Sequence, residues 1–360
     1  MKVSIVLVNY NGKKFNIECL NSILIQNYQD FEIVFVDNNS SDNSLDEVEK
    51  TFGQQINNGK IKIIKNNINL GFTGGNNKGV KKCKGEYICL LNNDVTVPEN
   101  WLQELIDGIQ KDKSLGAIGS IILDKGYEND IKKLYFNTKL KIVSTHFGDI
   151  DTIKITENEI KNDIIYTNLI SGCCFMYKKE IIDFLFPEFY FAYGEENFLS
   201  NVILLKGYKL GLSLKSFVNH YGSGSFGKKP TLKKVMNGTR NQLINFILFH
   251  SKKELLILFP LFITYHIFNS LFNYQHIRIL GKIMAVFSFL YYIKNVYLLN
   301  QYINNIRKID TYEFSSNFSY KLLENSYLTR FKGFKAKTLN IINNSYKIYF
   351  KIFKINKINY

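Results

Sequence analysis

Cysteine is sparse in this sequence, and its arrangement argues against two classes of protein. The five cysteines have neither the spacing of a metal site nor that of a disulfide framework, which favours a reducing interior over secretion. The first apolar run stops at Asn9, too early for a signal peptide. The sequence also has no internal repeat and no visible nucleic-acid recognition module. We therefore expect a cytoplasmic protein with no nucleic-acid partner.

Acidic residues are also fewer than basic ones. The chain of 360 residues carries 46 Lys and Arg against 31 Asp and Glu, a formal charge of +15. This excess favours a polyanionic partner, which could be nucleic acid, an anionic membrane surface or a phosphorylated small molecule, and charge alone does not choose among these. Because 46% of the residues are hydrophobic, the chain can bury a large core, and its length fits one large domain or two to three smaller parts.

Short apolar runs alternate with helical patterns over the first 120 residues. Each run is continuous and rich in β-branched residues, as in strands that are buried on both faces. Strands that alternate with helices predict parallel crossovers and an open α/β sheet, in which ligands gather at the carboxyl ends of the strands. The predicted strands are residues 3–8, 31–36, 61–64 and 87–91, with helices around 15–24 and 45–52.

Polar side chains follow each of these predicted strands. Asp37 ends the second, where a carboxylate can accept hydrogen bonds from a ribose or a base. Asn92, Asn93 and Asp94 end the fourth. An Asn-Asn-Asp sequence favours a turn, because these side chains bond their own backbone. The alternative is a cation site at Asp94, because a single carboxylate beside a diphosphate suits Mg²⁺ or Mn²⁺.

A glycine-rich segment, NLGFTGGNNKG, spans residues 69–79 and opens a helix after the third predicted strand. Glycines at a helix start let a phosphate approach free backbone N–H groups. The segment is not a dinucleotide fingerprint, since it follows the third strand and its glycine spacing differs. A flexible helix cap is the simpler alternative.

The pattern changes twice further along the chain. Residues 116–226 read as isolated strands and loops with one helix near 195–206, an α+β continuation of the same domain. Residues 243–249, 255–272 and 279–293 are strongly apolar, and the second run reaches spanning length at roughly 20 residues per crossing, although polar residues dilute it. Interfacial membrane contact and a soluble helical cap are equal alternatives. A basic, aromatic tail that would suit an anionic leaflet follows, with Lys335, Lys337, Lys347, Lys351, Lys354 and Lys357.

Seven segments occur in an order that resembles the family-2 glycosyltransferases of the GT-A fold, most closely their rhamnosyltransferase-like members. The resemblance covers residues 1–249. The segments are SIVLVNYNG, VDNNSSDNS, NLGFTGGNNKG, LLNNDVTVPENWL, SGCCFMYKKE, FYFAYGEE followed by GYKL, and NHYGSGS.

The resemblance implies an α/β fold of the GT-A (Rossmann-like) type, that of the nucleotide-diphospho-sugar transferases. The expected GT-A domain spans residues 1–228, with a nucleotide-sugar half at 1–115 and an acceptor half at 116–228. A C-terminal helical extension follows at 229–310, where the apolar runs raise membrane association, and the basic aromatic tail occupies 311–360.

The resemblance also implies roles for individual residues. Glu195 and Glu196 would form the catalytic pair, with Glu196 as the general base. Asp94 and His220 would hold a divalent cation, Mg²⁺ or Mn²⁺. The remaining implied contacts are with the acceptor, through Trp101 and Gly172, and with the donor, through Val8, Asn9, Asn11, Asp37, Asn69, Gly71, Gly74, Asn76, Asn77 and Asn93.

Two positions depart from the family pattern. Asp94 is the single carboxylate of its motif, and Phe198 begins an apolar run where the family has an acidic residue and then an arginine.

Glu195 and Glu196 have an alternative role as acids that favour the positive end of a helix, and His220 has one as a structural histidine. A non-catalytic binder of nucleotide-sugars or glycans stays open, as does a nucleotide-dependent oxidoreductase, which the missing fingerprint disfavours.

We therefore predict an inverting glycosyltransferase of hexosyl or rhamnosyl type. It would move a sugar from a nucleotide-diphosphate donor to a hydroxyl of a glycan or lipid-linked acceptor. A carboxylate that takes the acceptor proton contributes roughly 10²- to 10⁴-fold to the rate. The expected process is the synthesis of cell-surface polysaccharide or glycolipid. The expected location is the inner face of the cell membrane, as a peripheral protein with at most a shallow insertion.

Overall fold

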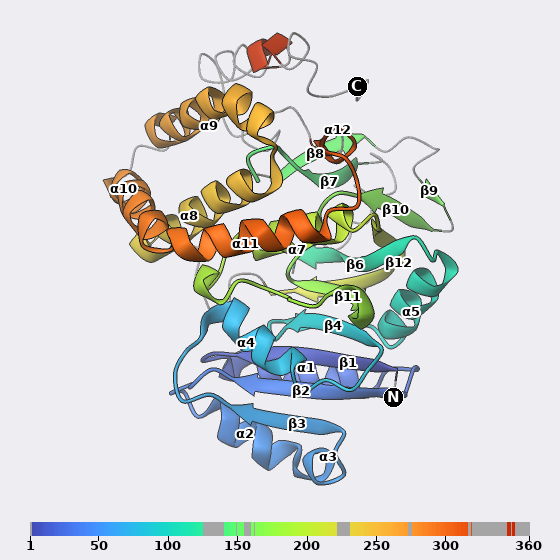
Figure 1. Ribbon diagram of the computed structural model, residues 1–360. Coiled ribbons are helices and arrows are strands. Elements are labelled where there is room, and N and C mark those ends of the chain that lie inside the picture. The colour runs from blue at the N-terminus through green and yellow to red at the C-terminus, as the bar shows by residue number, and fades with distance from the viewer. Residues whose placement is uncertain are drawn as a thin grey trace. The chain divides into compact units, whose positions relative to one another are not determined.

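The computed structural model describes most of the chain, which divides into two units (Figure 1). Unit 1 comprises Met1–Lys139, Ile155–Glu196 and Tyr208–Lys229, and unit 2 comprises Leu140–Lys154, Asn197–Gly207 and Pro230–Tyr360. The described residues are 2–124, 140–148, 150–154, 160, 161, 163–221, 231–272, 276–315, 318, 344–346, 348 and 349. The boundary predicted at residue 228 lies one residue before Lys229, where the last segment of unit 1 ends. Residues 140–154 and 197–207, predicted within the first domain, group with unit 2 instead.

The amino-terminal half of unit 1 is the predicted parallel sheet with helices between its strands (Figure 1). Its elements are β1 (Val3–Asn9), α1 (Lys13–Leu24), β2 (Phe31–Asp37), α2 (Ser44–Thr51), α3 (Gly53–Asn57), β3 (Ile61–Lys65), α4 (Gly71–Val80) and β4 (Tyr87–Asn92). The strands lie in the order β3-β2-β1-β4, and all three pairings are parallel. Every residue of β2 is buried, because apolar side chains on both faces of the strand pack against helices.

The sheet continues beyond β4 with strands of mixed direction. Strand β11 runs antiparallel to both β4 and β6, and β6 runs parallel to β12. The order among the described residues is β3-β2-β1-β4-β11-β6-β12-β10-β9, and the short β5 pairs with the end of β12. The added elements are β5 (Val95–Thr96), α5 (Trp101–Lys111), β6 (Leu115–Asp124), β9 (Ile160–Lys161), β10 (Ile164–Thr167), β11 (Cys174–Lys178), the 3₁₀ turns η3 (Lys179–Ile181) and η4 (Glu188–Tyr190), and β12 (Lys209–His220).

Glycines allow helix α4 to lie close against the parallel strands. A Cβ atom on Gly79 would lie 2.5 Å from Val6 Cγ1, and one on Gly75 would lie 2.7 Å from Val8 Cγ1. A larger side chain at either position would push the helix away from the sheet. Close helix–sheet packing therefore accounts for these two glycines of the glycine-rich segment.

Unit 2 is mainly helical. Its elements are the strand pair β7 (Leu140–Ser144) and β8 (Ile150–Lys154), the helix α7 (Glu195–Leu205) from Asn197 onward, and the helices α8 (Leu232–Phe249), α9 (Lys252–Phe272), α10 (His276–Tyr291), α11 (Ile293–Ile306) and α12 (Thr311–Ser315). Aromatic side chains of Phe147, Phe246 and Phe262 form its core, with Phe246 and Phe262 stacked at 4.7 Å between ring centroids. The predicted C-terminal helical extension is therefore present.

The apolar runs of this extension form helices. Within the described residues, no single helix is both long and apolar enough to span a bilayer, and only α10 and α11 together pass that test, with a 70° bend between them. The run at 255–272 lies in α9, which contains Pro260. The tail lysines at 335, 337, 347, 351, 354 and 357 lie outside the described residues.

Candidate active site

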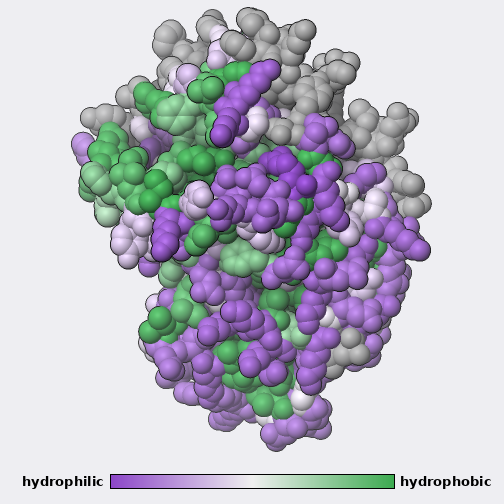
Figure 2. Space-filling view, in the orientation of Figure 1, coloured by the Kyte–Doolittle hydropathy of each residue, from purple (hydrophilic) through white to green (hydrophobic). Residues whose placement is uncertain are grey.

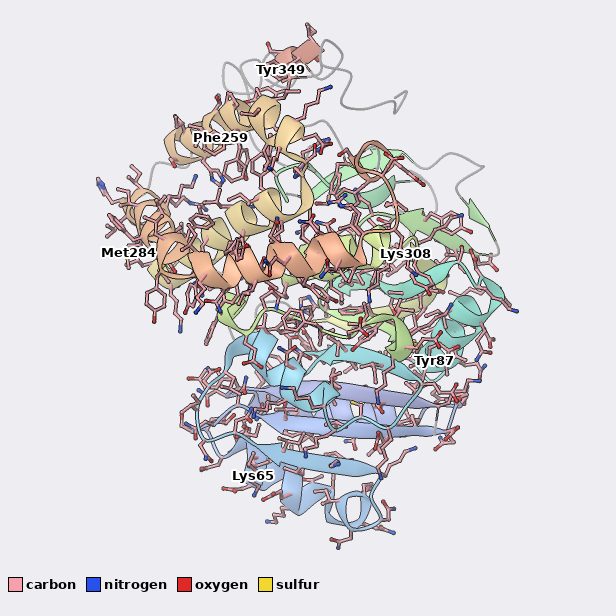
Figure 3. The ribbon with its side chains drawn as sticks, in the orientation of Figure 1. Lys65, Tyr87, Phe259, Met284, Lys308 and Tyr349 are labelled. Atoms are coloured by element: carbon pink, nitrogen blue, oxygen red, sulfur yellow. The ribbon has the colours of Figure 1, made fainter. Side chains whose placement is uncertain are left out.

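The carboxyl ends of the parallel strands form one edge of the sheet in unit 1. Strand register pairs Asn9 with Asp37 and Val8 with Asn92, so β1, β2 and β4 end level with one another. Figure 3 labels Lys65, at the carboxyl end of β3, on the opposite side of the sheet from Tyr87, at the amino end of β4. We call the side marked by Lys65 the carboxyl edge, and it is where ligands of open α/β sheets bind.

Asn9 holds together the loops that follow β1 and β2. Its Nδ2 donates to Asp37 Oδ1 at 2.8 Å and to Ser44 Oγ at 2.8 Å, and the residue is fully buried. Asp37 Oδ2 in turn accepts from the backbone N–H of Ser40 at 3.1 Å. Two residues predicted to hold the donor thus also fix the loops of the carboxyl edge. Sequence reasoning named neither Ser40 nor Ser44 in this role.

Asn93 occupies the middle of the turn after β4 and stabilises it from within. Its Nδ2 donates to Asn16 Oδ1 at 2.8 Å and to Asn9 Oδ1 at 3.3 Å. A Cβ atom on Gly12 would lie 2.1 Å from Asn93 Nδ2, so the loop after β1 needs a glycine there. The Asn-Asn-Asp sequence is therefore a turn, as the simpler alternative proposed, and its second amide is a structural group.

Asp94, the last residue of that turn, lies beside His220. Strand β12 pairs antiparallel with β5 and places His220 opposite Val95, while Tyr221 N donates to Asp94 O at 2.9 Å. As a result, His220 Nε2 lies 3.5 Å from Asp94 Oδ1. The structure thus brings together the two residues predicted as metal ligands, although 126 positions separate them in the chain.

The chemistry of this pair fits a divalent cation that shares its shell with a substrate. Within the described parts of the chain, no group of three His, Cys, Asp or Glu side chains is arranged to hold a metal ion. Mg²⁺ and Mn²⁺ need no such cage, because they bind through one or two protein groups and keep waters or substrate phosphates as the other ligands. A carboxylate and an imidazole at 3.5 Å, further apart than a normal hydrogen bond, meet that requirement.

The start of α4 is tied to the segment that leads to the two glutamates. Gly71 has φ +71°, and a Cβ atom there would lie 2.4 Å from Phe191 O. Asn77 Nδ2 donates to Phe186 O at 2.8 Å, and Phe186 N donates back to Asn77 Oδ1 at 3.2 Å. Asn76 Nδ2 donates to a carbonyl of its own helix, that of Phe72. Both asparagine amides, predicted as donor contacts, are thus bonded within the protein.

The other predicted donor residues differ in exposure. Val8 and Asn69 are half-buried and Asn11 is exposed, so all three have surface to offer a ligand. Asn69 Oδ1 accepts from Gly71 N at 2.8 Å, which shapes the start of the helix. Gly74 packs against Leu70, whose Cβ would lie 2.7 Å from an added Cβ atom. Direct donor contact by these residues stays a prediction.

The buried Glu195 and the half-buried Glu196 open helix α7 and form an acid pair. Among the described residues, Oε2 of each carboxyl group is buried without a hydrogen-bond partner. Burial raises the pKa of Glu195 well above its ordinary value, and the charge of Glu196 raises it further. Burial also raises the pKa of Glu196, while nearby N–H groups and a hydrogen bond with Glu195 lower it. Burial and the neighbouring carboxylate thus both favour the neutral form of Glu195, which as a carboxylic acid can donate a hydrogen bond to Glu196.

Gly172 links this acid pair to the turn that carries Asp94. A Cβ atom on Gly172 would lie 3.9 Å from Glu195 Oε1 and 4.0 Å from Glu196 Cβ. The adjacent Cys173 accepts a hydrogen bond at its carbonyl from Asn92 N at 2.9 Å. A short run of contacts within unit 1 therefore connects both acidic groups to the end of β4.

Trp101 and Phe198 lie in cores. Trp101 has no exposed surface, and its Nε1 donates to Ser120 Oγ at 3.0 Å, so the predicted acceptor-side position offers no indole surface to a ligand. Phe198, which departs from the family pattern, packs against Phe249 in unit 2 with ring centroids 5.7 Å apart. The apolar run after the acid pair is therefore explained by the packing of helix α7.

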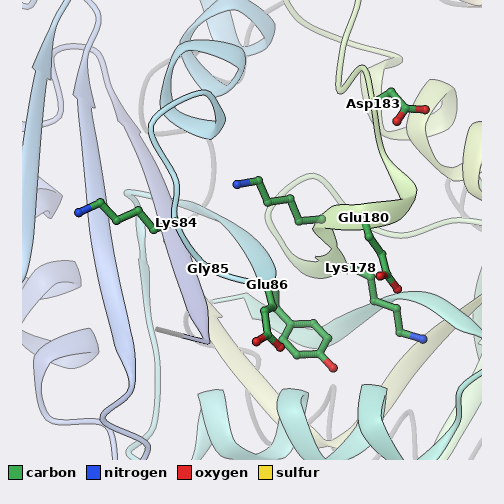
Figure 4. Close-up of a pocket in the computed structure, with 8 residues that line it drawn as sticks. Lys84, Gly85, Glu86, Lys178, Glu180 and Asp183 are labelled. Carbon is green, nitrogen blue, oxygen red and sulfur yellow. The ribbon is translucent and has the colours of Figure 1, made fainter.

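A separate pocket of about 630 Å³ is lined by residues around Lys84 and Lys178 (Figure 4). It lies at the amino end of β4 and the carboxyl end of β11, where Lys178 is paired with Tyr87. Lysines and acids both line it: Lys84, Gly85, Glu86, Tyr87, Lys178, Lys179, Glu180 and Asp183. None of the predicted site residues is among them, so this pocket is separate from the candidate active site.

Comparison with known proteins identifies relatives that align with part of this chain. The family model described as glycosyl transferase family 2 matches residues 4–186, just over half of the chain. The glycosyltransferase GlyG of Streptococcus pneumoniae serotype 4 is 27% identical over 186 residues, which cover 46% of this chain and 60% of that protein. The UDP-Glc:alpha-D-GlcNAc-diphosphoundecaprenol beta-1,3-glucosyltransferase WfaP of Escherichia coli is 36% identical over 92 residues, covering 26% of this chain and 35% of WfaP.

A solved structure supports the same fold. GalNAc-T7, crystallised with UDP, GalNAc and Mn²⁺, superposes with a TM-score of 0.58 at 18% identity, covering 71% of this chain and 49% of that one. At this identity the likeness concerns the fold alone. The strand order of unit 1, the candidate residues at its carboxyl edge and the family model agree: this chain belongs to glycosyl transferase family 2, and its α/β fold is of the GT-A type.

Proposed function

We propose that this protein transfers a sugar, with inversion, from a nucleotide-diphosphate donor to a hydroxyl group of its acceptor. The observation that supports this most is the acid pair Glu195 and Glu196, in which Oε2 of each carboxyl group is buried without a partner among the described residues, near Gly172 and the turn that holds Asp94. The reaction needs one carboxylate to accept the proton of the acceptor hydroxyl, and another group to stabilise the charge of the leaving diphosphate. Family membership removes the oxidoreductase alternative.

Glu196 is the proposed general base. Inverting transfer forms a bond from the acceptor oxygen to the anomeric carbon while the bond from that carbon to the diphosphate oxygen breaks, and the acceptor proton passes to the base. Burial raises the pKa of Glu196, which improves its affinity for that proton near neutral pH. Glu195 keeps its proton and donates a hydrogen bond to Glu196, so that Glu196 remains the carboxylate that accepts the acceptor proton.

Asp94 and His220 are the proposed holders of a divalent cation. When bound, that cation supplies Lewis acidity toward the diphosphate of the donor. Val8, Asn11 and Asn69 are the residues of the carboxyl edge with surface to contact the nucleotide. The solved structure of GalNAc-T7 contains Mn²⁺, which is consistent with a divalent cation in this protein but is an observation on GalNAc-T7 itself.

The acceptor is proposed to be a glycan or a lipid-linked glycan of cell-surface polysaccharide or glycolipid synthesis. The printed name of WfaP describes glucosyl transfer to a diphosphoundecaprenol-linked sugar, and this relative aligns with 26% of the chain. The aligned part of the chain covers 60% of GlyG and 35% of WfaP. We therefore propose only a general class of acceptor and not the particular acceptor of WfaP. A peripheral location at the inner face of the membrane belongs to the same proposal.

The test compares two amide substitutions under identical conditions. A panel of UDP-, GDP- and dTDP-sugars first identifies the donor by the thermal stabilisation it gives in the presence of Mn²⁺. Glu196→Gln should then keep donor binding while lowering donor turnover by at least roughly 10²-fold, the low end for a lost general base. Glu180→Gln, an exposed acid at the separate pocket, is the matched control. Donor binding without turnover in the wild type would instead identify a non-catalytic binder.

A further inference from the structure

Helix α10 presents an unusually apolar exposed surface in unit 2. Figure 2 shows hydrophobic residues gathered over the region that Figure 1 labels α10, and Figure 3 labels Met284 on its outer side. Phe287 is 68% exposed, Tyr291 is 80% exposed and Leu280 is 51% exposed. The exposed large apolar side chains of α10 are Ile277, Ile279, Leu280, Ile283, Met284, Val286, Phe287, Leu290 and Tyr291. At 3.6 residues per turn they cover about half of the helix circumference.

The opposite side of α10 packs within unit 2. A Cβ atom on Gly281 would lie 2.7 Å from Val235 Cβ in helix α8, and Ala285 is buried. Arg240 Nη1 of α8 donates to Ser288 Oγ at 3.0 Å. The helix is thus held in place by one side while its other side stays apolar and exposed. An exposed apolar surface of this size marks a contact with another protein or with lipid.

The charges of α10 and α11 have one sign. Residues 276–306 contain no Asp or Glu, whereas they contain Arg278, Lys282 and Lys294, which gives this segment a formal charge of +3 with His neutral. Anionic lipid headgroups attract such residues next to an apolar helix face. Tyr291 and Tyr297, both strongly exposed, are of the residue type enriched at the boundary between headgroups and acyl chains.

The length of these helices favours a position in the plane of the membrane surface. Helix α10 has 16 residues, about 24 Å at 1.5 Å per residue, against a hydrocarbon core of about 30 Å. Helix α11 follows after a 70° bend and is shorter, with 14 residues. A bent pair with one exposed apolar side suits insertion into the headgroup region better than a crossing.

We propose that the exposed apolar side of α10, continued by Ile293, Tyr297 and Leu298 of α11, docks on an anionic lipid bilayer. We call this surface the docking face. The inference does not depend on sugar transfer, because it rests on unit 2 alone. It narrows the sequence-based expectation, which raised membrane association for the apolar runs of residues 229–310 and for the basic tail, to one surface on α10 and α11.

Vesicle sedimentation of the full chain tests the docking face. Vesicles of phosphatidylglycerol and phosphatidylcholine in equal parts should pellet the wild type, and vesicles of phosphatidylcholine alone should pellet it less. The double variant Leu280→Glu with Phe287→Glu should lower affinity for the anionic vesicles by more than about tenfold, because two inserting side chains become charges that the headgroups repel. The control pair Ile25→Glu with Ile68→Glu makes the same charge change at exposed apolar sites of unit 1 and should bind as the wild type.

A fluorescent variant reports insertion directly. Trp101 is the single tryptophan and is fully buried, so its signal stays constant as background. Phe287→Trp should shift its emission to the blue on anionic vesicles and be quenched by brominated acyl chains, whereas Ile25→Trp should show neither effect.

Three results would overturn the proposal. The first is unchanged pelleting of the double variant, which would move the membrane contact to another segment. The second is a wild type that is a dimer in sedimentation equilibrium and does not bind vesicles, together with a double variant that is a monomer. That result would make the docking face a contact between two copies of the chain. The third is an unshifted Phe287→Trp emission on vesicles that pellet the protein. Nucleotide binding, measured on the same samples, reports on unit 1 separately and keeps a failure of the proposed transfer reaction distinct from these results.

Discussion

Replacing Asn93 by alanine separates the structural role of the Asn-Asn-Asp turn from its proposed chemical role. The substitution removes the amide that donates to Asn16 Oδ1 at 2.8 Å and to Asn9 Oδ1 at 3.3 Å. Asn9 Oδ1 keeps two other donors, Gly12 N at 3.1 Å and Asn16 Nδ2 at 2.9 Å. Asn16 Oδ1, in a residue that is 1% exposed, loses the donor that Asn93 provides.

The expected cost is therefore that of one buried acceptor left without a donor, about 1–3 kcal/mol of unfolding free energy. For a domain of this size, each kcal/mol lowers Tm by about 2–4 °C. Urea unfolding followed by circular dichroism measures the loss. Asn100→Ala, at an exposed asparagine whose side chain makes no cap bond to α5, is the control and should stay within about 0.5 kcal/mol.

A loss for Asn93→Ala no larger than that of the control would refute the assignment of this amide to the scaffold. A double-mutant cycle with Asn16→Ala strengthens the test, because the two residues share one bond and their effects should not add. The account also expects Asn93→Ala to change nucleotide affinity only through stability, at temperatures where the variant is folded.

The remaining predictions concern the acid pair and the start of α4. Glu195→Gln should raise Tm. The pKa of Glu195 is above its ordinary value in the folded state, so the wild type loses stability as pH rises above about 4.3, and the gain in Tm from the substitution should grow from pH 4 to pH 8. A gain that is the same at every pH would argue against a raised pKa for Glu195. Gly71→Ala should cost more than the about 1–2 kcal/mol of its φ of +71° alone, because the added methyl group meets Phe191 O at 2.4 Å, and denaturant unfolding with wild-type stability would contradict this packing.

Local sequence patterns predicted the parallel part of the fold well. Continuous apolar runs are the direct signature of strands buried on both faces, and β1, β2, β3 and β4 fall on the predicted segments. Parallel strands of similar length end at one edge, which is why Asp37 and Asp94 could be placed there without coordinates.

Long-range contacts limited what the sequence could predict. Asn16 shows no pattern of its own, and its bond with Asn93 joins positions 77 residues apart. The indole of Trp101 has a single polar atom, Nε1, which donates to Ser120 Oγ inside the core. The sequence does not show this hydrogen bond, so the burial of Trp101 was not predicted. The glycines at positions 75 and 79 serve close packing on Val6 and Val8, a contact between elements that a glycine-rich phosphate loop would not need.

The apolar C-terminal runs illustrate the same limit. Hydropathy marks α9 and α10 almost equally, but only coordinates show that α10 has a packed side at Gly281 and an exposed side at Phe287. The sequence raised membrane association for all the apolar runs of residues 229–310, and the exposed side chains single out α10 among them.

The central claim is that Asp94 and the acid pair serve one nucleotide-sugar reaction at the carboxyl edge of unit 1. Its most direct test is isothermal titration calorimetry of UDP, GDP and dTDP, each with and without Mn²⁺, on the wild type and on Asp94→Ala. The account predicts that one nucleotide binds the wild type at least about tenfold more tightly with Mn²⁺, a difference of about 1.4 kcal/mol, and that Asp94→Ala removes this dependence. Equal Mn²⁺ dependence in both proteins, or no binding of any of the three nucleotides to the wild type, would contradict it.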